Sequence, residues 1–278
     1  MDRPRFTSIG RPVDPAWPTN RAIIFLSLTV IAVVSAFRLL FGGLALVPAV
    51  VAGVLAGATV FFAWALTREV DPDHDLAAFV GALIALPTWE LLGSPRFAIV
   101  LLLLLALRIV NRTVGPAARP LDSIAILLLA SWVAWNGGWV GTFAVFLAFL
   151  LDATLAPGHR LHLAGAGAAL ALTAVAASRA GFPPTIAGAR PLSLGALALM
   201  LPFLAVMGRS GTLRTLTDVG ALPLSAKRVR SSQALAILVV ALAVFFDGTE
   251  GLGEISPLWA AIVGSGLFGF FSKRRTAV

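Results

Sequence analysis

Hydrophobic residues of this chain fall into ten runs, separated by short segments that are polar or contain glycine and proline. A helix that crosses the hydrocarbon core of a bilayer needs about 20 residues, within a range of roughly 17–25. Several runs are shorter, but together they predict an all-α, polytopic transmembrane helical bundle of about ten spans. The runs cover approximately residues 22–38, 44–66, 74–89, 96–110, 120–135, 138–152, 161–178, 191–208, 231–247 and 256–272.

One uncharged stretch, residues 123–151, is long for a single span and short for two. Asn136, Gly137 and Gly138 form a strong turn signal in its middle, and Trp135 and Trp139 flank that turn. Tryptophan favours the membrane–water interface, so we divide the stretch into two spans. The alternative is one kinked helix, which would give nine spans.

Three polar segments between the apolar runs follow one pattern. They begin at Thr67, Asn111 and Asp152, and each has Val or Leu at its fourth position and proline at its sixth. Repeats of about 40 residues are typical of arrays of helical units. The pattern therefore predicts repeated helix-turn-helix hairpins that are related as parallel repeats.

Composition supports a membrane location. The chain is 59% hydrophobic and only 12% charged, with a mean hydropathy of +0.94. Soluble domains contain roughly 25% charged residues, so this chain has too little polar surface to cover a water-exposed core. The chain has no cysteine, which excludes disulfides, zinc–thiolate sites and thiol nucleophiles. We attribute its net charge of +8 to basic loops on one membrane face and expect no nucleic-acid binding.

The distribution of basic residues predicts the orientation. With both termini inside, inner segments hold seventeen of the 21 Lys and Arg residues, and outer segments hold only Arg38, Arg96, Arg179 and Arg190. Cytoplasmic loops carry such an excess, so we expect a multi-pass protein of the bacterial cytoplasmic (inner) membrane. Residues 1–20 are predicted to be a disordered cytoplasmic segment, 21–272 one transmembrane domain, and 273–278 a short basic tail.

The middles of the predicted spans contain no ionisable residue, because Glu90, Arg108, Asp122, Asp152 and Asp247 all lie at span ends. Charged groups at mid-membrane usually mark ion or proton pathways. Their absence argues against an ion-coupled transporter, but a carrier for apolar or lipid cargo needs none. Such a carrier should have a cavity at mid-depth, which we expect to be lined by Thr59, Thr88, Ser131 and Thr142.

Basic residues of the inner segments are candidates for binding a phosphate group or a lipid headgroup, because guanidinium and ammonium groups pair with phosphate. The alternative role is setting the topology alone. The candidates are Arg68, Arg112, Arg119, Arg214, Lys227, Arg228 and Arg230.

Asp71, Asp73 and Asp75 alternate with other residues in the first repeat and are candidate Mg²⁺ ligands. The alternative is that they cap the following helix near its positive end. The second repeat has Gly115 and Ala117 where the first has Asp71 and Asp73, so the shared element is the proline turn, which favours capping.

We predict a permease-like or scaffold protein whose cytoplasmic loops bind membrane lipids or a protein partner, with no cofactor. The alternative is a membrane-embedded transferase or hydrolase that acts on an isoprenoid or phospholipid phosphate. In that alternative the three aspartates hold Mg²⁺, and Arg112, Arg119, Arg228 and Arg230 bind the phosphate. The sequence leaves open whether the protein is an enzyme.

Overall fold

The computed structural model describes residues 7–181 and 191–275, and this part of the chain is helical apart from its loops and one isolated antiparallel bridge between Leu216 and Pro223. The helices are α1 (Pro18–Leu40), α2 (Leu46–Val70), α3 (Asp75–Leu92), α4 (Phe97–Asn111), α5 (Pro120–Trp135), α6 (Trp139–Thr154), α7 (Leu161–Arg179), α8 (Pro191–Ala198), α9 (Phe203–Arg209), α10 (Ala226–Glu254) and α11 (Ser256–Arg275). The all-α prediction is confirmed.

Each of the ten apolar runs coincides with helix, and the run 191–208 is divided between α8 and α9. Six segments are long and apolar enough to cross a membrane: α1, α2, α3, α7, the α8–α9 segment and α10. The apolar helices α4, α5, α6 and α11 are shorter by this measure. The membrane-protein class is therefore supported, while the count of ten spans stays a prediction.

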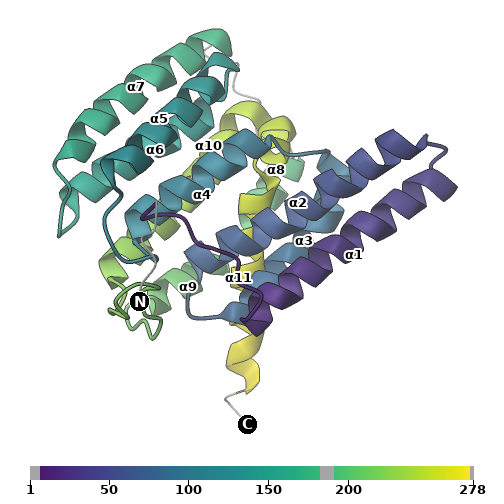
Figure 1. The fold of residues 1–278 in the computed structure, drawn as a ribbon, viewed down its shortest axis with the longest axis horizontal. Helices are drawn as coiled ribbons and strands as arrows, with labels where there is room; N and C mark the ends of the chain where they lie inside the picture. The colour runs from purple at the N-terminus through teal and green to yellow at the C-terminus, as the bar shows by residue number, and fades with distance from the viewer. Residues whose placement is uncertain (1–6, 182–190, 276–278) are drawn as a thin grey trace.

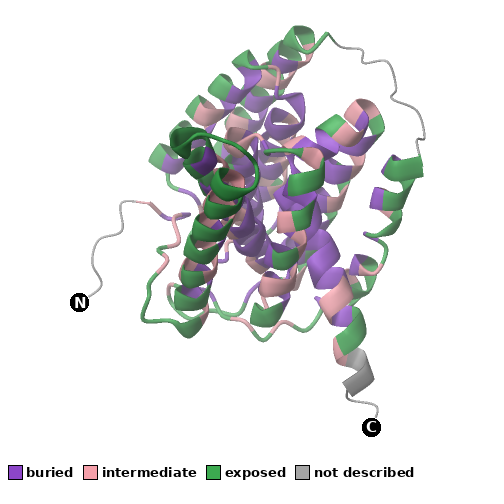
Figure 2. Ribbon diagram, turned by 90° about the vertical axis from the view of Figure 1, so that its right-hand side faces the viewer, coloured by how far each residue is buried: buried purple, intermediate pink, exposed green. Residues whose placement is uncertain are grey.

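The helices form a layered bundle in which α2, α3, α4, α10 and α11 occupy the middle (Figure 1). Helix α1 packs on α2 at one side, and α5, α6 and α7 form a layer at the other. Buried residues concentrate between the helices and exposed ones on the outside (Figure 2). Large apolar side chains such as Phe25, Phe37 and Leu128 are exposed there, as expected for a surface that faces lipid.

The three repeated segments join α2 to α3, α4 to α5 and α6 to α7, and the joined helices pack against each other. Each proline lies in the loop, where its missing N–H breaks no helical hydrogen bond. The loops differ in detail, since Arg112 adopts a left-handed conformation with φ 53° after α4. The equivalence of the three units as structural repeats stays a prediction.

Small residues permit the closest helix contacts. A Cβ atom on Gly53 or Gly57 of α2 would meet Ser35, Ile31 or the carbonyl of Ser27 on α1. A Cβ on Gly264 of α11 would meet the backbone of Gly81 on α3. Because lipid gives no hydrophobic drive for helices to associate, such close backbone contact supplies packing energy.

The N-terminal segment, predicted to be a disordered lead-in, is described from residue 7 onward. There it lies along one end of the bundle, and Ser8 and Ile9 are buried. Ser8 donates to Asp122 through both its backbone N–H and its hydroxyl group, and the hydroxyl also lies 3.0 Å from the carbonyl oxygen of Ala117. Residues 1–6 and the side chains of the predicted basic tail, 273–278, lie outside the described residues.

Candidate anion-binding site

One end of the bundle, here called the loop end, comprises loops 71–74, 112–119, 155–160 and 210–225. These loops touch one another: the N–H groups of Asp218 and Val219 donate to the carbonyls of Thr113 and Val114. Arg11 of the N-terminal segment pairs with Asp218 at 2.7 Å. The loop end is therefore one continuous polar surface rather than separate turns.

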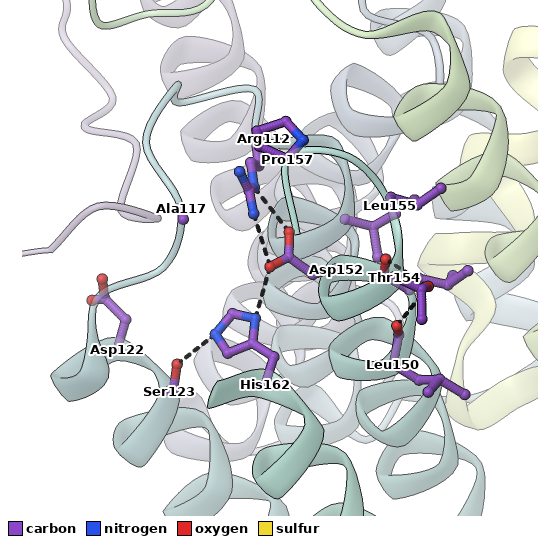
Figure 3. A network of polar contacts seen from close by, with 12 residues as sticks. Arg112, Ala117, Asp122, Ser123, Leu150, Asp152, Thr154, Leu155, Pro157 and His162 are labelled. Atoms are coloured by element: carbon purple, nitrogen blue, oxygen red, sulfur yellow. Dashed lines mark hydrogen bonds and ion pairs between the residues drawn. The ribbon is translucent and has the colours of Figure 1, made fainter. Parts of the chain in front are cut away.

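Asp152 is the centre of the largest ion network at this end (Figure 3). Its carboxylate is 1% exposed and accepts two hydrogen bonds from Arg112, at 2.8 and 3.0 Å. Nη1 of Arg228 lies 2.6 Å from Oδ1, and Nδ1 of His162 lies 2.8 Å from Oδ2. A buried carboxylate needs such partners, because desolvation disfavours its charge.

Arg228 is itself buried, and both of its terminal nitrogens take part in this network. Besides Asp152, it donates to the carbonyls of Val110, Leu155 and Pro157, which end α4 and follow α6. Arg112 and Arg228 were candidates for phosphate binding, but their guanidinium groups are occupied by Asp152 and by backbone carbonyls. They tie helix ends together and are not part of the site proposed below.

Glu69 forms a second buried network of the same kind. Its carboxylate, fully buried, accepts from Arg108 at 2.9 Å and from the hydroxyl of Thr113 at 2.8 Å. The side-chain amide of Asn111 donates to the backbone carbonyl of Glu69. Glu69 belongs to the first repeat and Asn111 to the second, so the repeat loops are connected through their polar residues.

The three aspartates of the first repeat have three different partners. Asp71 pairs with His74 at 2.8 Å, and Asp75 pairs with Arg68 at 3.5 Å. Asp73 accepts from the backbone N–H groups of Arg214 and Thr215 and from the Thr215 hydroxyl. In the described part of the chain, no group of three His, Asp or Glu side chains is close enough to hold a metal ion. The Mg²⁺ hypothesis gains no support from this arrangement.

Three further predicted cations lie apart from one another. Arg68 stacks over the Trp64 ring, with its Cζ atom 5.1 Å from the ring centroid, and donates to Asn20. Arg119 precedes the first residue of α5, where its backbone N–H donates to Asp122 and to Ser8. Lys227 is exposed in the first turn of α10.

Arg209, Arg214 and Arg230 line one cavity of about 700 Å³ between α9, the following loop and the 71–74 turn. Arg209 donates to the carbonyls of Ala205 and Gly269, and Arg230 donates to those of Met207 and Gly208. Among the described residues, none of the three guanidinium groups is within salt-bridge distance of a carboxylate. The cavity therefore combines three cations that keep unused hydrogen-bond donors, since each guanidinium has five.

Two neighbouring titratable groups are already satisfied. The hydrogen bond that the His74 ring donates to Asp71 raises the pKa of His74 above its usual value of 6.5 and outweighs burial, which acts to lower it. Burial acts to raise the pKa of Asp73, but the hydrogen bonds from Thr215 and Arg214 outweigh it and lower this pKa below 3.8. Asp73 stays ionised and fixes the backbone of Arg214, which places that residue at the cavity.

The hydroxyl groups expected to line a carrier cavity are instead bonded within their own helices. The hydroxyls of Thr59, Thr88 and Ser131 each donate to the carbonyl four residues earlier, and that of Thr142 donates to Trp139. Thr59 and Thr142 are fully buried. This arrangement offers no polar lining to a mid-depth cavity.

Sequence reasoning did not identify the roles of Asp152 and His162. One feature of the sequence could have indicated them. Asp152 occupies the first position of the third repeat, where the other two repeats have the uncharged Thr67 and Asn111. An acidic residue at the end of a span requires a cationic partner. Comparison with known proteins adds no identity: no family model, no curated protein and no solved structure matches this chain.

Proposed function

We propose that this membrane protein binds the phosphate of an anionic lipid headgroup in the cavity formed by Arg209, Arg214 and Arg230. The observation that carries the proposal is that three guanidinium groups line one cavity without a carboxylate partner among the described residues. Guanidinium groups make charge-assisted hydrogen bonds to phosphate oxygens, often in pairs. Asp71 and Asp73 line the same cavity but are bonded to His74 and to the backbone of Arg214 and Thr215, so a phosphate would use the guanidinium donors that remain free.

The surroundings of the cavity favour a lipid over a free phosphate ion. Leu201 and Leu204, just before and within α9, are exposed apolar side chains. Arg209 ends the same helix and lines the cavity. A lipid whose acyl chains lie along the leucines would bring its headgroup to the arginines, because a short helix places the two ends only a few turns apart.

We also propose that the protein has ten spans and both termini on the cytoplasmic side of a bacterial inner membrane, so that the cavity faces the inner leaflet. The support is the excess of Lys and Arg in the predicted inner segments. Headgroup binding there suits a permease-like protein or a scaffold that also holds a partner at its loops. The alternative, a Mg²⁺-dependent enzyme acting on a lipid phosphate, is favoured by no contact described above.

The test compares short-chain phosphatidylglycerol, short-chain phosphatidylcholine and inorganic phosphate by calorimetry on the purified protein in detergent. The triple substitution Arg209→Gln, Arg214→Gln and Arg230→Gln should weaken binding of phosphatidylglycerol at least tenfold, or about 1.4 kcal/mol. The matched control replaces three exposed cations elsewhere, Arg21, Arg160 and Lys227, by Gln.

Equal binding by the two triple variants would overturn the proposed site. Tight binding of inorganic phosphate, with no gain from the acyl chains, would replace the lipid by a free phosphate as the ligand. Equal affinity of the wild-type protein for phosphatidylcholine would show that the cavity does not select anionic headgroups.

A further inference from the structure

The Asp152 network includes a row of three hydrogen-bonded side chains that plays no part in the proposed headgroup binding. The hydroxyl oxygen of Ser123 lies 3.0 Å from Nε2 of His162, and Nδ1 of the same ring lies 2.8 Å from Oδ2 of Asp152 (Figure 3). Serine, histidine and aspartate thus form one chain of hydrogen bonds across α5, α7 and α6. This connectivity is the one that activates a serine hydroxyl in acyl-transfer enzymes of unrelated folds.

The ring of His162 has a defined orientation. His162 is 2% exposed, and the edge of its ring packs on Phe149 with the centroids 4.8 Å apart. In the tautomer that carries its proton on Nδ1, the ring donates to Asp152 and Nε2 presents its lone pair to Ser123. The Ser123 hydroxyl also lies 3.3 Å from the carbonyl oxygen of Arg119.

Ser123 is reachable, unlike the two residues behind it. It is partly exposed in the first turns of α5, between the exposed side chains of Leu121 and Ile124. Exposed apolar side chains of this kind can contact acyl chains, so the ester group of a lipid beside α5 could reach the Ser123 hydroxyl.

We propose that Ser123 is a nucleophile for fatty-acyl esters, with His162 as its general base and Asp152 as a positioning residue. The Ser123 oxygen forms a bond to the ester carbonyl carbon while its proton moves to Nε2 of His162. The intermediate then breaks the bond to the alcohol, which leaves with that proton. Water hydrolyses the acyl-serine by the same route, so the net reaction is ester plus water to acid plus alcohol.

The test labels the full-length protein, reconstituted in lipid vesicles, with a long-chain alkyl fluorophosphonate and locates the adduct by mass spectrometry. In the labelling step the serine oxygen bonds to phosphorus, fluoride leaves, and the proton passes to His162. We expect the adduct on Ser123 and none after Ser123→Ala. The matched control is Ser131→Ala, which removes an exposed serine of the same helix whose hydroxyl bonds only to Leu127 in the described structure.

The base is tested by His162→Gln, which should slow labelling about 100-fold or more, within the range for general-base catalysis. His159→Gln is its control, because the centroids of the His159 and His162 rings lie 4.5 Å apart, while the Ser123 hydroxyl bonds to His162. For Asp152→Asn we expect a lower labelling rate per folded molecule. We also expect a shift in the pH at which this rate is half of its maximum. A purely structural role would reduce the amount of folded protein and leave both quantities unchanged.

Absence of an adduct on Ser123 in the folded wild-type protein would overturn this proposal, as would equal labelling of wild type and His162→Gln. The result is independent of the proposed headgroup site, since the triple arginine variant should still be labelled at Ser123.

Discussion

Arg112 and Asp152 face each other in a two-point ion pair, with Nε of Arg112 2.8 Å from Oδ1 and Nη2 3.0 Å from Oδ2. The arginine follows α4 in a left-handed backbone conformation, which is costly for a residue with a side chain. The pair therefore holds the end of α4 against α6. With Arg228 and His162 it connects four helices at one buried carboxylate.

Removal of Arg228 should destabilise the protein strongly, because the buried carboxylate of Asp152 loses one of its two arginine partners and three backbone carbonyls lose a donor. We expect Arg228→Ala to lower the free energy of unfolding by about 3–5 kcal/mol, measured by SDS titration in mixed micelles. Arg38→Ala breaks an exposed pair with Glu90 and should cost about 1 kcal/mol or less. Similar losses for the two variants would contradict the central role of the Asp152 network.

The contact between α3 and α11 should tolerate no added side chain. A Cβ at Gly264 would overlap the backbone of Gly81, so Gly264→Ala should lower the free energy of unfolding by about 1–3 kcal/mol. Gly167 on α7 has open space around it, and Gly167→Ala should be neutral or stabilising by up to about 1 kcal/mol. Thermal unfolding in detergent compares the two, and an unchanged Tm for Gly264→Ala would argue against this packing.

Stability should fall as pH rises through the titration of His74. Its pKa is raised in the folded protein, so the protonated form stabilises the fold. That contribution is complete below the usual value of 6.5 and is lost as pH passes the higher folded pKa. Between pH 6 and pH 8, Tm should therefore decrease more for the wild-type protein than for His74→Gln. His159→Gln is the control and should keep the wild-type pH dependence.

The orientation can be measured directly because the chain has no cysteine of its own. Leu222 at the loop end and Leu91 near the opposite end are both strongly exposed. We expect a membrane-impermeant maleimide to label Leu91→Cys in spheroplasts and to label Leu222→Cys only after lysis. The reverse result would place the basic loops and the proposed headgroup site on the outer face.

The helices were predictable from the sequence because apolar length and turn residues act locally. The run 120–135 and helix α5 share their bounds, since Pro120 fits a first helical position and the turn at Asn136 ends the helix. The proline turns of the repeats likewise lie between helices, as their spacing indicated.

The site was less predictable because charge pairing depends on contacts between distant segments. Arg228 and Arg230 are two residues apart and both basic, yet one is buried on Asp152 and the other lines the α9 cavity. The number and spacing of charged residues in the sequence do not distinguish the buried arginine from the one that lines the cavity. The burial of Ser8 and Ile9 depends in the same way on a partner, Asp122, that lies more than a hundred residues away.

The Asp152 network also determines where this bundle is stiff. It clamps the ends of α4, α6, α7 and α10 within a few ångströms of one carboxylate, whereas α10 loses helical geometry near its other end, at Gly248 with φ 63°. If these helices tilt, the Asp152 network holds their linked ends in place. The displacement of each helix then increases with distance from that network. Shape changes in this protein would be widest on the face away from the basic loops, even when a ligand binds beside them.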